Sequence, residues 1–383
     1  MTSKFKLTRQ PVSHISLSRN LEKAFRPSPR GQALGVEFDL RTFTWYVPQK
    51  KINDMSQTLD EMVDKFCPAR PIAFTVNVFE RAMGILENFA QMSKIGRTLL
   101  LVAKAEMSYH LERFHQQNHL KPARQEQYCV LSEYARKNIL QFRALLVISP
   151  EFHLPLEDPS AKLRRAGGAH IVLYTDASGK PKERTDPAYT PTCLGSFWPA
   201  KGANKTSRAL AFVMPYSFLR GPTISKGKGG QRFVMDQTVL LELLPAFATI
   251  LQFPDLFRHR VVTVFSDNQV TVDLFMNNTA TKAYTAYFLE AFQFMLMALD
   301  IKLVMRWKRR RSTYPMAMSD DCTHAQFAHA MPGTSCQILQ LPPPLFKVIH
   351  GTVSYHSHLL DTLRDEVRVY LEGLFPDLVF PCL

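Results

Sequence analysis

The segment HIVLYTDASGK, residues 170–180, decides the fold that we expect for this chain. Residues 171–175 are β-branched, aliphatic or aromatic, which is typical of a buried strand, and they run directly into Asp176. The segment therefore predicts a strand that carries a carboxylate at its end. Three more acids lie in contexts that could bring them to the same place: Glu242 in the helical run TVLLELLPAFATIL, Asp267 at the end of VVTVFSD, and Asp320 in SDDCTHAQFAHAM. Four carboxylates around one sheet would form a site for divalent cations.

The composition limits the class of protein and of partner. A chain of 383 residues, 46% of them apolar, is long enough for two or three domains with real cores. Its net charge of +14 favours a polyanionic partner such as nucleic acid, although a basic protein without such a role would have the same balance. The six cysteines contain no CxxC pair, which favours reduced thiols. No apolar run approaches the roughly 18 residues of a membrane span, so we expect a nuclear or cytoplasmic protein without a membrane partner.

The first half of the chain is predicted to be a basic arm followed by a helical region. Residues 1–30 contain seven Lys and Arg and one acid, as in a flexible arm that contacts nucleic acid or in a mitochondrial presequence. Residues 31–150 begin with a β-hairpin pattern on either side of residues 40–42 and continue with amphipathic helical patterns from Gln49. A segment rich in Pro, Gly and charge, residues 149–169, predicts a domain boundary.

Residues 168–332 are predicted to form an α/β domain. After the first strand, TCLGSFWP and SRALAFVMPYS suggest an antiparallel meander, and FLRGPTISKGKGGQRF is expected to be an irregular loop. A helix, the strand VVTVFSD, two helices, the strand DIKLVMRW and a helix that starts near Ser319 complete the order. In residues 333–383, LPPPLFKVIHG is expected to break the pattern, so we predict a C-terminal tail with one amphipathic helix.

This order of strands, helices and acids resembles the ribonuclease H fold, a mixed five-stranded sheet flanked by helices. YTDAS, LLELLPAF, FSDNQVTVDLF and SDDCTH are similar to the TDAS, LEL, sDNq and ADxLSR signatures of retroelement ribonuclease H domains. Upstream, ALGVEFDLRTFTWYVPQKK and the helices after it resemble the end of a reverse transcriptase palm with its thumb and connection. The resemblance covers roughly residues 30–330 and is greatest to the tyrosine-recombinase (DIRS-like) retroelements. It implies the C-terminal part of a reverse transcriptase without its polymerase centre, which could work with a polymerase-bearing chain.

The resemblance also implies a reaction and a cofactor. Ribonucleases of this type cut the RNA strand of RNA:DNA hybrids with two Mg²⁺ or Mn²⁺ ions about 4 Å apart. By motif, Asp176 would contact both ions, Glu242 and Asp267 would hold one of them, and Asp320 the other. Asp321 stays open as an alternative to Asp320.

Each acid also has an ordinary structural interpretation. Asp176 could cap a turn with Ser178, Asp267 together with Asn268 could cap a helix, and Asp320 or Asp321 could interact with a helix dipole. Glu242 lies between leucines, where a carboxylate requires a metal or a salt bridge. The loop after Asp176 is longer than in the family, and no histidine precedes the last acid. The alternative function is therefore a domesticated, non-catalytic nucleic-acid-binding protein that retains the fold.

Two basic groups are candidates for contacts with nucleic acid. The region between Pro187 and Met235 has seven Lys and Arg and no acid, and its glycines could let backbone amides approach phosphates. A second cluster, with Trp307 inside it, lies just before the last acid and could instead be a nuclear localisation signal. The candidates in the two groups are Lys201, Lys205, Arg208, Lys226, Lys228 and Arg232, and Arg306, Lys308, Arg309, Arg310 and Arg311.

Overall fold

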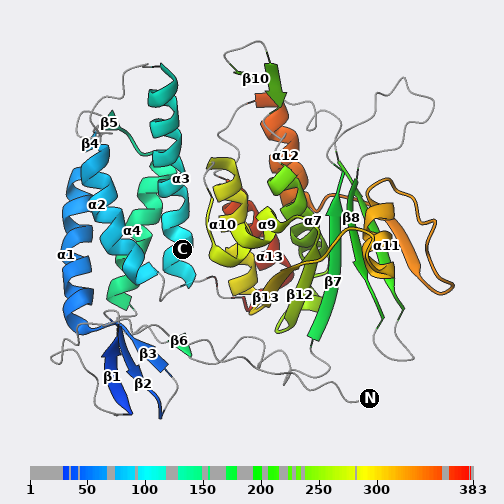
Figure 1. Cartoon of the computed structure of the whole chain (residues 1–383), viewed down its shortest axis with the longest axis horizontal. Coiled ribbons are helices and arrows are strands. Elements are labelled where there is room, and N and C mark those ends of the chain that lie inside the picture. The colour runs from blue at the N-terminus through cyan, green and yellow to red at the C-terminus, as the bar shows by residue number, and fades with distance from the viewer. Residues whose placement is uncertain are drawn as a thin grey trace, which may run out of the picture.

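The computed structural model describes residues 29–33, 36–41, 44–66, 74–90, 94–117, 128–148, 154–155, 170–178, 193–200, 206–214, 223–226, 230–233, 238–280, 283–355, 362–378 and 380. In these residues an N-terminal helical part lies beside a mixed six-stranded sheet that is flanked by helices (Figure 1). The predicted basic arm lies outside the described residues, except for Pro29 and Arg30.

The N-terminal part contains the hairpin and the helices that the sequence predicts. Strands β1 (Arg30–Ala33), β2 (Val36–Asp39), β3 (Thr44–Tyr46) and β6 (Leu154–Pro155) form a small antiparallel sheet, in which β2 and β3 are the predicted hairpin. Four helices follow: α1 (Gln49–Phe66), α2 (Val76–Ala90), α3 (Lys94–Gln117) and α4 (Glu133–Ile148). A two-residue strand pair, β4 (Phe74–Thr75) with β5 (Tyr128–Cys129), joins the loops of this part.

The second sheet has the strand order β13-β12-β7-β8-β9-β14. Its strands are β7 (His170–Ala177), β8 (Cys193–Trp198), β9 (Arg208–Val213), β12 (Val261–Ser266), β13 (Lys302–Trp307) and β14 (Ser335–Gln340). The predicted antiparallel meander is confirmed, because β8 pairs with both β7 and β9 in antiparallel register. Strand β12 runs parallel to both β7 and β13, and β14 runs parallel to β9.

Helices cover the sheet from both faces and create two separate cores (Figure 1). On one face α7 (Thr238–Gln252) and α9 (Gln269–Asn277) pack against the strands, and α10 (Ala283–Ala298) packs behind them. On the other face α11 (Tyr314–Cys322) packs against β7, β8 and β9. Because side chains alternate along a strand, Leu194 of β8 joins the first core, whereas Cys193 and Phe197 join the second core with Met318 of α11.

A buried polar cluster connects the helical part to the α/β part. Glu290 of α10 is fully buried and pairs with Arg364 Nη1 at 2.7 Å. The same carboxylate accepts hydrogen bonds from Asn138 Nδ2 at 2.9 Å and from the Tyr134 hydroxyl at 3.1 Å, both on α4. Burial raises the pKa of Glu290 to about 7 against the opposing effect of Arg364. Three helices from distant parts of the sequence therefore meet at one carboxylate.

Three expectations for the loops and the tail are corrected by the structure. The segment expected to be irregular contains a hairpin of β10 (Thr223–Lys226) and β11 (Gly230–Phe233), since its glycines permit the turn between two short β-forming runs. The sheet has a sixth strand, β14, at its edge. The side chains of β14 are alternately exposed and half-buried, so the hydrophobic pattern of this strand in the sequence is weak. The tail has two helices, α12 (Pro343–Tyr355) and α13 (Leu363–Leu374), because the prolines occupy a first helical turn, where proline is tolerated.

The last helix of the domain begins earlier in the chain than the predicted start near Ser319. It begins at Tyr314 with Pro315 in its first turn, and it ends at Cys322. Asp320 and Asp321 therefore lie near its C-terminal end, where the helix dipole disfavours a negative charge. The helix-start interpretation of these two acids is wrong. No helix among the described residues is both long enough and apolar enough to span a membrane.

Candidate metal centre

Asp176 lies near the C-terminal end of β7 and is 1% exposed. Its Oδ1 accepts a hydrogen bond from the backbone N–H of Ala177 at 2.8 Å. Its Oδ2 has no hydrogen-bond donor among the described residues. A buried carboxylate oxygen without a donor is costly, so the position calls for a proton or a cation.

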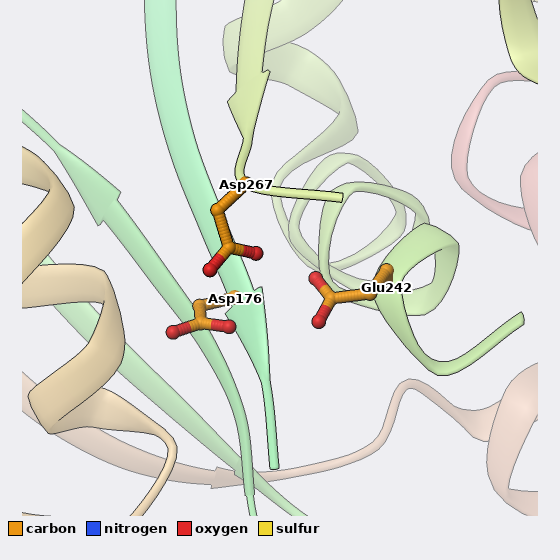
Figure 2. Close-up of side chains that lie close together, drawn as sticks. All are labelled: Asp176, Glu242 and Asp267. Carbon is orange, nitrogen blue, oxygen red and sulfur yellow. The ribbon is translucent and has the colours of Figure 1, made fainter. Parts of the chain in front are cut away.

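Glu242 projects from α7 toward Asp176 (Figure 2). The residues around it on the helix, Leu241, Leu243 and Leu244, are all buried, and Glu242 itself is 4% exposed. Its Oε2 also has no hydrogen-bond partner in the described part of the chain. The apolar helix therefore brings a carboxylate to the sheet without supplying its counter-charge.

Asp267 directly follows β12, the strand that runs parallel to β7. The helix-capping role belongs to its neighbour, because the Asn268 side chain accepts the hydrogen bond from the Thr271 N–H at 3.1 Å. The indole Nε1 of Trp307 donates to the backbone carbonyl of Asp267 at 2.9 Å. The Asp267 carboxylate is thus left to face the cluster, and its side chain is 16% exposed.

The three carboxylates point toward one another from a strand, a helix and a strand end (Figure 2). One oxygen from each lies within 4.8 Å of the others. Around one octahedral Mg²⁺, ligands at 2.0–2.1 Å are about 3 Å apart when they are neighbours and about 4.2 Å apart when they are opposite, so the three oxygens would move closer on binding. The arrangement therefore fits a hard divalent cation bound by Asp176, Glu242 and Asp267 after the cluster contracts.

Burial, together with the charges of the cluster, raises the pKa values of all three acids. Burial, followed by the nearby charge of Asp267, raises the pKa of Asp176 to about 8. Burial and the charges of Asp176 and Asp267 raise the pKa of Glu242 well above its ordinary value. Burial raises the pKa of Asp267 as well, against the opposing effect of Arg310. The raised pKa values favour the protonated carboxyl groups when no cation is bound, and a divalent ion would replace these protons.

The fourth predicted acid, Asp320, joins the cluster through Asp176. It is 1% exposed and lies outside the group of three oxygens, and its charge adds to the effects of burial and Asp267 that raise the pKa of Asp176. Arg310 Nε donates to Asp320 Oδ1 at 2.9 Å, and Arg311 Nε donates to Oδ2 at 2.5 Å. Burial alone would raise the pKa of Asp320, but these two arginines outweigh it and lower the pKa.

The choice between Asp320 and Asp321 follows from the rotation of α11. Asp321 Oδ2 accepts hydrogen bonds from the backbone N–H of His329 at 3.0 Å and from its ring Nδ1 at 2.6 Å. This carboxylate therefore ties the end of the helix to the following turns. Asp320 instead shares the guanidinium of Arg310 with Asp176, so it is the acid of this pair that lies toward the cluster.

Gly195 allows α11 to lie close enough to the sheet for this contact. It pairs with Asp176 in the register of β7 and β8. A Cβ at this position would lie 2.1 Å from the carbonyl oxygen of Ser319 and 3.0 Å from the N–H of Thr323. Sequence reasoning did not single out Gly195, although a glycine inside the strand TCLGSFWP is itself a signal of close backbone approach.

Few of the predicted basic residues lie at the carboxylates. Lys201, Lys205 and Lys228 lie outside the described residues, as do the side chains of Lys226 and Arg232 in the β10–β11 hairpin. Arg208 lies at the start of β9 and packs over the rings of Trp198 at 5.6 Å and Phe253 at 5.3 Å. In the strand register it is three residues from Ala211, the partner of Gly195, which places it about 10 Å along the sheet from the Asp176 level.

The second basic group lies at the edge of the cluster. Arg306 is exposed on β13, Arg309 is exposed in the loop after it, and Arg310 and Arg311 contact Asp320 as described. Lys308 Nζ lies 5.4 Å from the ring centre of Tyr174 and 5.2 Å from that of Phe265, and these two rings stack on each other. The sequence alone predicted phosphate contacts for this whole group, whereas Arg310 and Arg311 pair with the protein's own carboxylates.

Comparison with known proteins adds no family assignment. No protein-family model matches this chain, and no curated protein matches it significantly.

Proposed function

We propose that this chain is a metal-dependent ribonuclease H-like endonuclease that cuts the RNA strand of RNA:DNA hybrids, and that it derives from a retroelement reverse transcriptase. The observation that carries the proposal is the convergence of Asp176, Glu242 and Asp267 near the ends of two parallel strands, with Asp320 connected to Asp176 through Arg310. The motifs single out these same four acids, and the metal roles that the motifs imply are part of the proposal.

The topology of the sheet supports the same proposal. Leaving out the edge strand β14, its order β13-β12-β7-β8-β9 combines an antiparallel meander with two strands added in parallel beside the first strand. This is the arrangement expected of a ribonuclease H-like domain. In such a sheet a ligand site forms where the carboxyl ends of adjacent parallel strands meet. Asp176 and Asp267 lie at these ends.

The donor set is suited to Mg²⁺ or Mn²⁺. All four acids offer hard oxygen ligands, and two of the buried oxygens, Asp176 Oδ2 and Glu242 Oε2, have no hydrogen-bond partner among the described residues. Asp176 would contact both ions, Glu242 and Asp267 would hold one, and Asp320 the other. When bound, such ions activate water and stabilise the charge on the scissile phosphate and the leaving oxygen.

Other residues would orient the ligands and the nucleic acid. Trp307 holds the backbone at Asp267 through its indole hydrogen bond, and Gly195 lets α11 bring in Asp320. Arg306 and Lys308 lie at the border of the site, where they could attract phosphates of a duplex. Recognition would rely on the shape of the hybrid and its 2′-hydroxyls rather than on base sequence.

The test is cleavage of a labelled RNA:DNA hybrid in Mg²⁺ by the wild type and four variants. We expect Asp176→Asn, Glu242→Gln and Asp320→Asn to lose activity by about a hundredfold or more, because charge stabilisation in the transition state is lost. Asp321→Asn, one residue away on the same helix, should keep most of the activity. No cleavage by the wild type, or equal cleavage by Asp176→Asn, would remove the enzymatic proposal.

One observation favours the alternative of a non-catalytic nucleic-acid-binding protein. Arg310 and Arg311 already pair with Asp320, so arginine could have replaced a cation in a copy that keeps only the fold. Hybrid binding without cleavage in either Mg²⁺ or Mn²⁺ would support this alternative. Assays on double-stranded DNA and single-stranded RNA would reveal a DNA nuclease or an integrase-like enzyme of the same general fold.

A further inference from the structure

One arginine reaches three of the four carboxylates. Arg310 lies in the loop between β13 and α11, and its guanidinium pairs with Asp320. The same group is 3.7 Å from Asp176 Oδ2 and 3.9 Å from Asp267 Oδ2. Arg311, its neighbour, has a left-handed backbone conformation with φ 50°, so the chain turns sharply where the two arginines approach the acids.

These contacts define two overlapping groups of acids. One oxygen each of Asp176, Glu242 and Asp267 lies within 4.8 Å of the others. The guanidinium of Arg310 lies among Asp176, Asp267 and Asp320, and among these described acids Glu242 has no ion pair with it. The motif assignment requires the second cation between Asp176 and Asp320, where Arg310 lies. Arg310 and that cation therefore compete for the same carboxylate oxygens.

We propose that Arg310 takes the place of the second cation in the free protein and moves to the scissile phosphate when the substrate binds. The inference rests on the proposed function, and it adds the order in which the site is filled. The free protein binds one divalent ion at Asp176, Glu242 and Asp267. A second ion binds only after Arg310 leaves Asp320.

Physical chemistry gives reasons for this behaviour. A guanidinium does not lose its proton in proteins, so a metal ion cannot neutralise it and has to displace it. The Arg310 side chain is 54% exposed, which leaves room for it to turn outward. Two oxygens of a phosphate can accept paired hydrogen bonds from the planar guanidinium, as those of a carboxylate do, so a phosphate is a suitable new partner. Arg310 would thus prevent premature loading of the second ion and then contribute to binding of the reacting group.

The first experiment is calorimetric titration of the metal-free protein with Mn²⁺ in the absence of nucleic acid. The wild type should bind one ion tightly, and Arg310→Ala should bind two. The second ion should bind to the variant at least about tenfold more tightly than any weak second binding that the wild type shows at high Mn²⁺, because charged hydrogen bonds no longer compete. Arg309→Ala is the matched control: it removes the same charge from the same loop and should behave as the wild type.

The second experiment measures hybrid cleavage as a function of Mn²⁺ concentration. Arg310→Ala should reach half of its maximal rate at a lower Mn²⁺ concentration than the wild type, while its kcat falls about tenfold because the phosphate contact is lost. Arg310→Lys, which keeps the charge but not the paired geometry, should be intermediate in both quantities. A residue with a purely structural role would not shift the metal dependence and kcat in this opposed manner.

The outcomes separate this inference from the proposed function. Equal Mn²⁺ stoichiometry and affinity in the wild type and in Arg310→Ala, with cleavage intact, would overturn the role of Arg310 alone. Absence of Mn²⁺ binding in every variant would overturn the metal centre itself, and this inference with it.

Discussion

Replacing Asp176 by asparagine should stabilise the metal-free protein at neutral and alkaline pH. Asn has nearly the shape of a protonated Asp, and the Asp176 carboxyl is buried with one oxygen that has no hydrogen-bond donor among the described residues. When no metal ion is bound, wild-type Asp176 must either retain a proton or carry a buried charge that Arg310, 3.7 Å from its Oδ2, offsets only in part. The variant removes this conflict and also removes the ligand that the proposed metal centre needs most.

The sign and size of the effect follow from the pKa of Asp176. Its folded pKa of about 8 lies above the ordinary 3.8, so the folded state holds a proton that the unfolded state releases between these values. The stability that this group contributes is therefore fully present below about pH 4 and is lost as the pH rises toward 8. An isolated group would lose about 6 kcal/mol over this range. Because Asp176 shares protons with Glu242 and Asp267, we expect about half of that.

The assay is urea unfolding of the wild type and Asp176→Asn at pH 4.5 and pH 8, in EDTA and in Mg²⁺. In EDTA the two proteins should be equally stable at pH 4.5, and the variant should be more stable by about 3 kcal/mol at pH 8. In Mg²⁺ at pH 8 the order should reverse when the ion is present at about a thousand times its Kd, since binding then stabilises the wild type by about 4.1 kcal/mol.

A surface variant controls for the change in net charge. Asp273 is exposed on α9, so Asp273→Asn should show neither the pH dependence nor the reversal in Mg²⁺. If Asp176→Asn were less stable than the wild type in EDTA at pH 8, the carboxylate would already be compensated within the protein. Such a result would refute the premise that the buried Asp176 charge destabilises the metal-free protein.

Three further predictions concern the elements that support the site. Gly195→Ala should destabilise the protein by about 2 kcal/mol and reduce hybrid cleavage, because the new Cβ would clash with the backbone of α11. Gly84→Ala is the control, since a Cβ there has no neighbour within 4 Å and should be tolerated. Equal urea midpoints for the two variants would contradict this prediction. Arg364→Met should lower the free energy of unfolding by about 3–5 kcal/mol, because Glu290 would stay buried without its positively charged partner. The double variant Arg364→Met with Glu290→Gln should recover much of this stability in urea unfolding. Hybrid binding should weaken steeply with salt, and Lys308→Ala should lower the slope of log K against log salt by about one; a flat salt response would exclude a phosphate contact.

The sequence predicted much of the site because its signals are local. A run of β-branched and aromatic residues that ends in an acid specifies a strand with a carboxylate at its end, as at Asp176 and Asp267. Since the carboxyl ends of parallel neighbours meet at one edge of a sheet, two such strands bring their acids together once they pair. Glu242 was predictable for a similar reason, because a carboxylate in an apolar helix needs a partner in the core.

Tertiary packing decided what these local patterns leave open. Successive side chains of a helix point about 100° apart, so neighbouring acids point in different directions. The packing of α11 on β8 at Gly195 determines that Asp320 lies toward Asp176, whereas Asp321 contacts His329. The sequence marks Arg310 only as one of several basic residues, and the turn at Arg311 directs it to carboxylates that lie far away along the chain. The sequence by itself thus determined which acids reach the edge of the sheet. Their charge balance was decided by the folded structure, because charges interact through space and not along the chain.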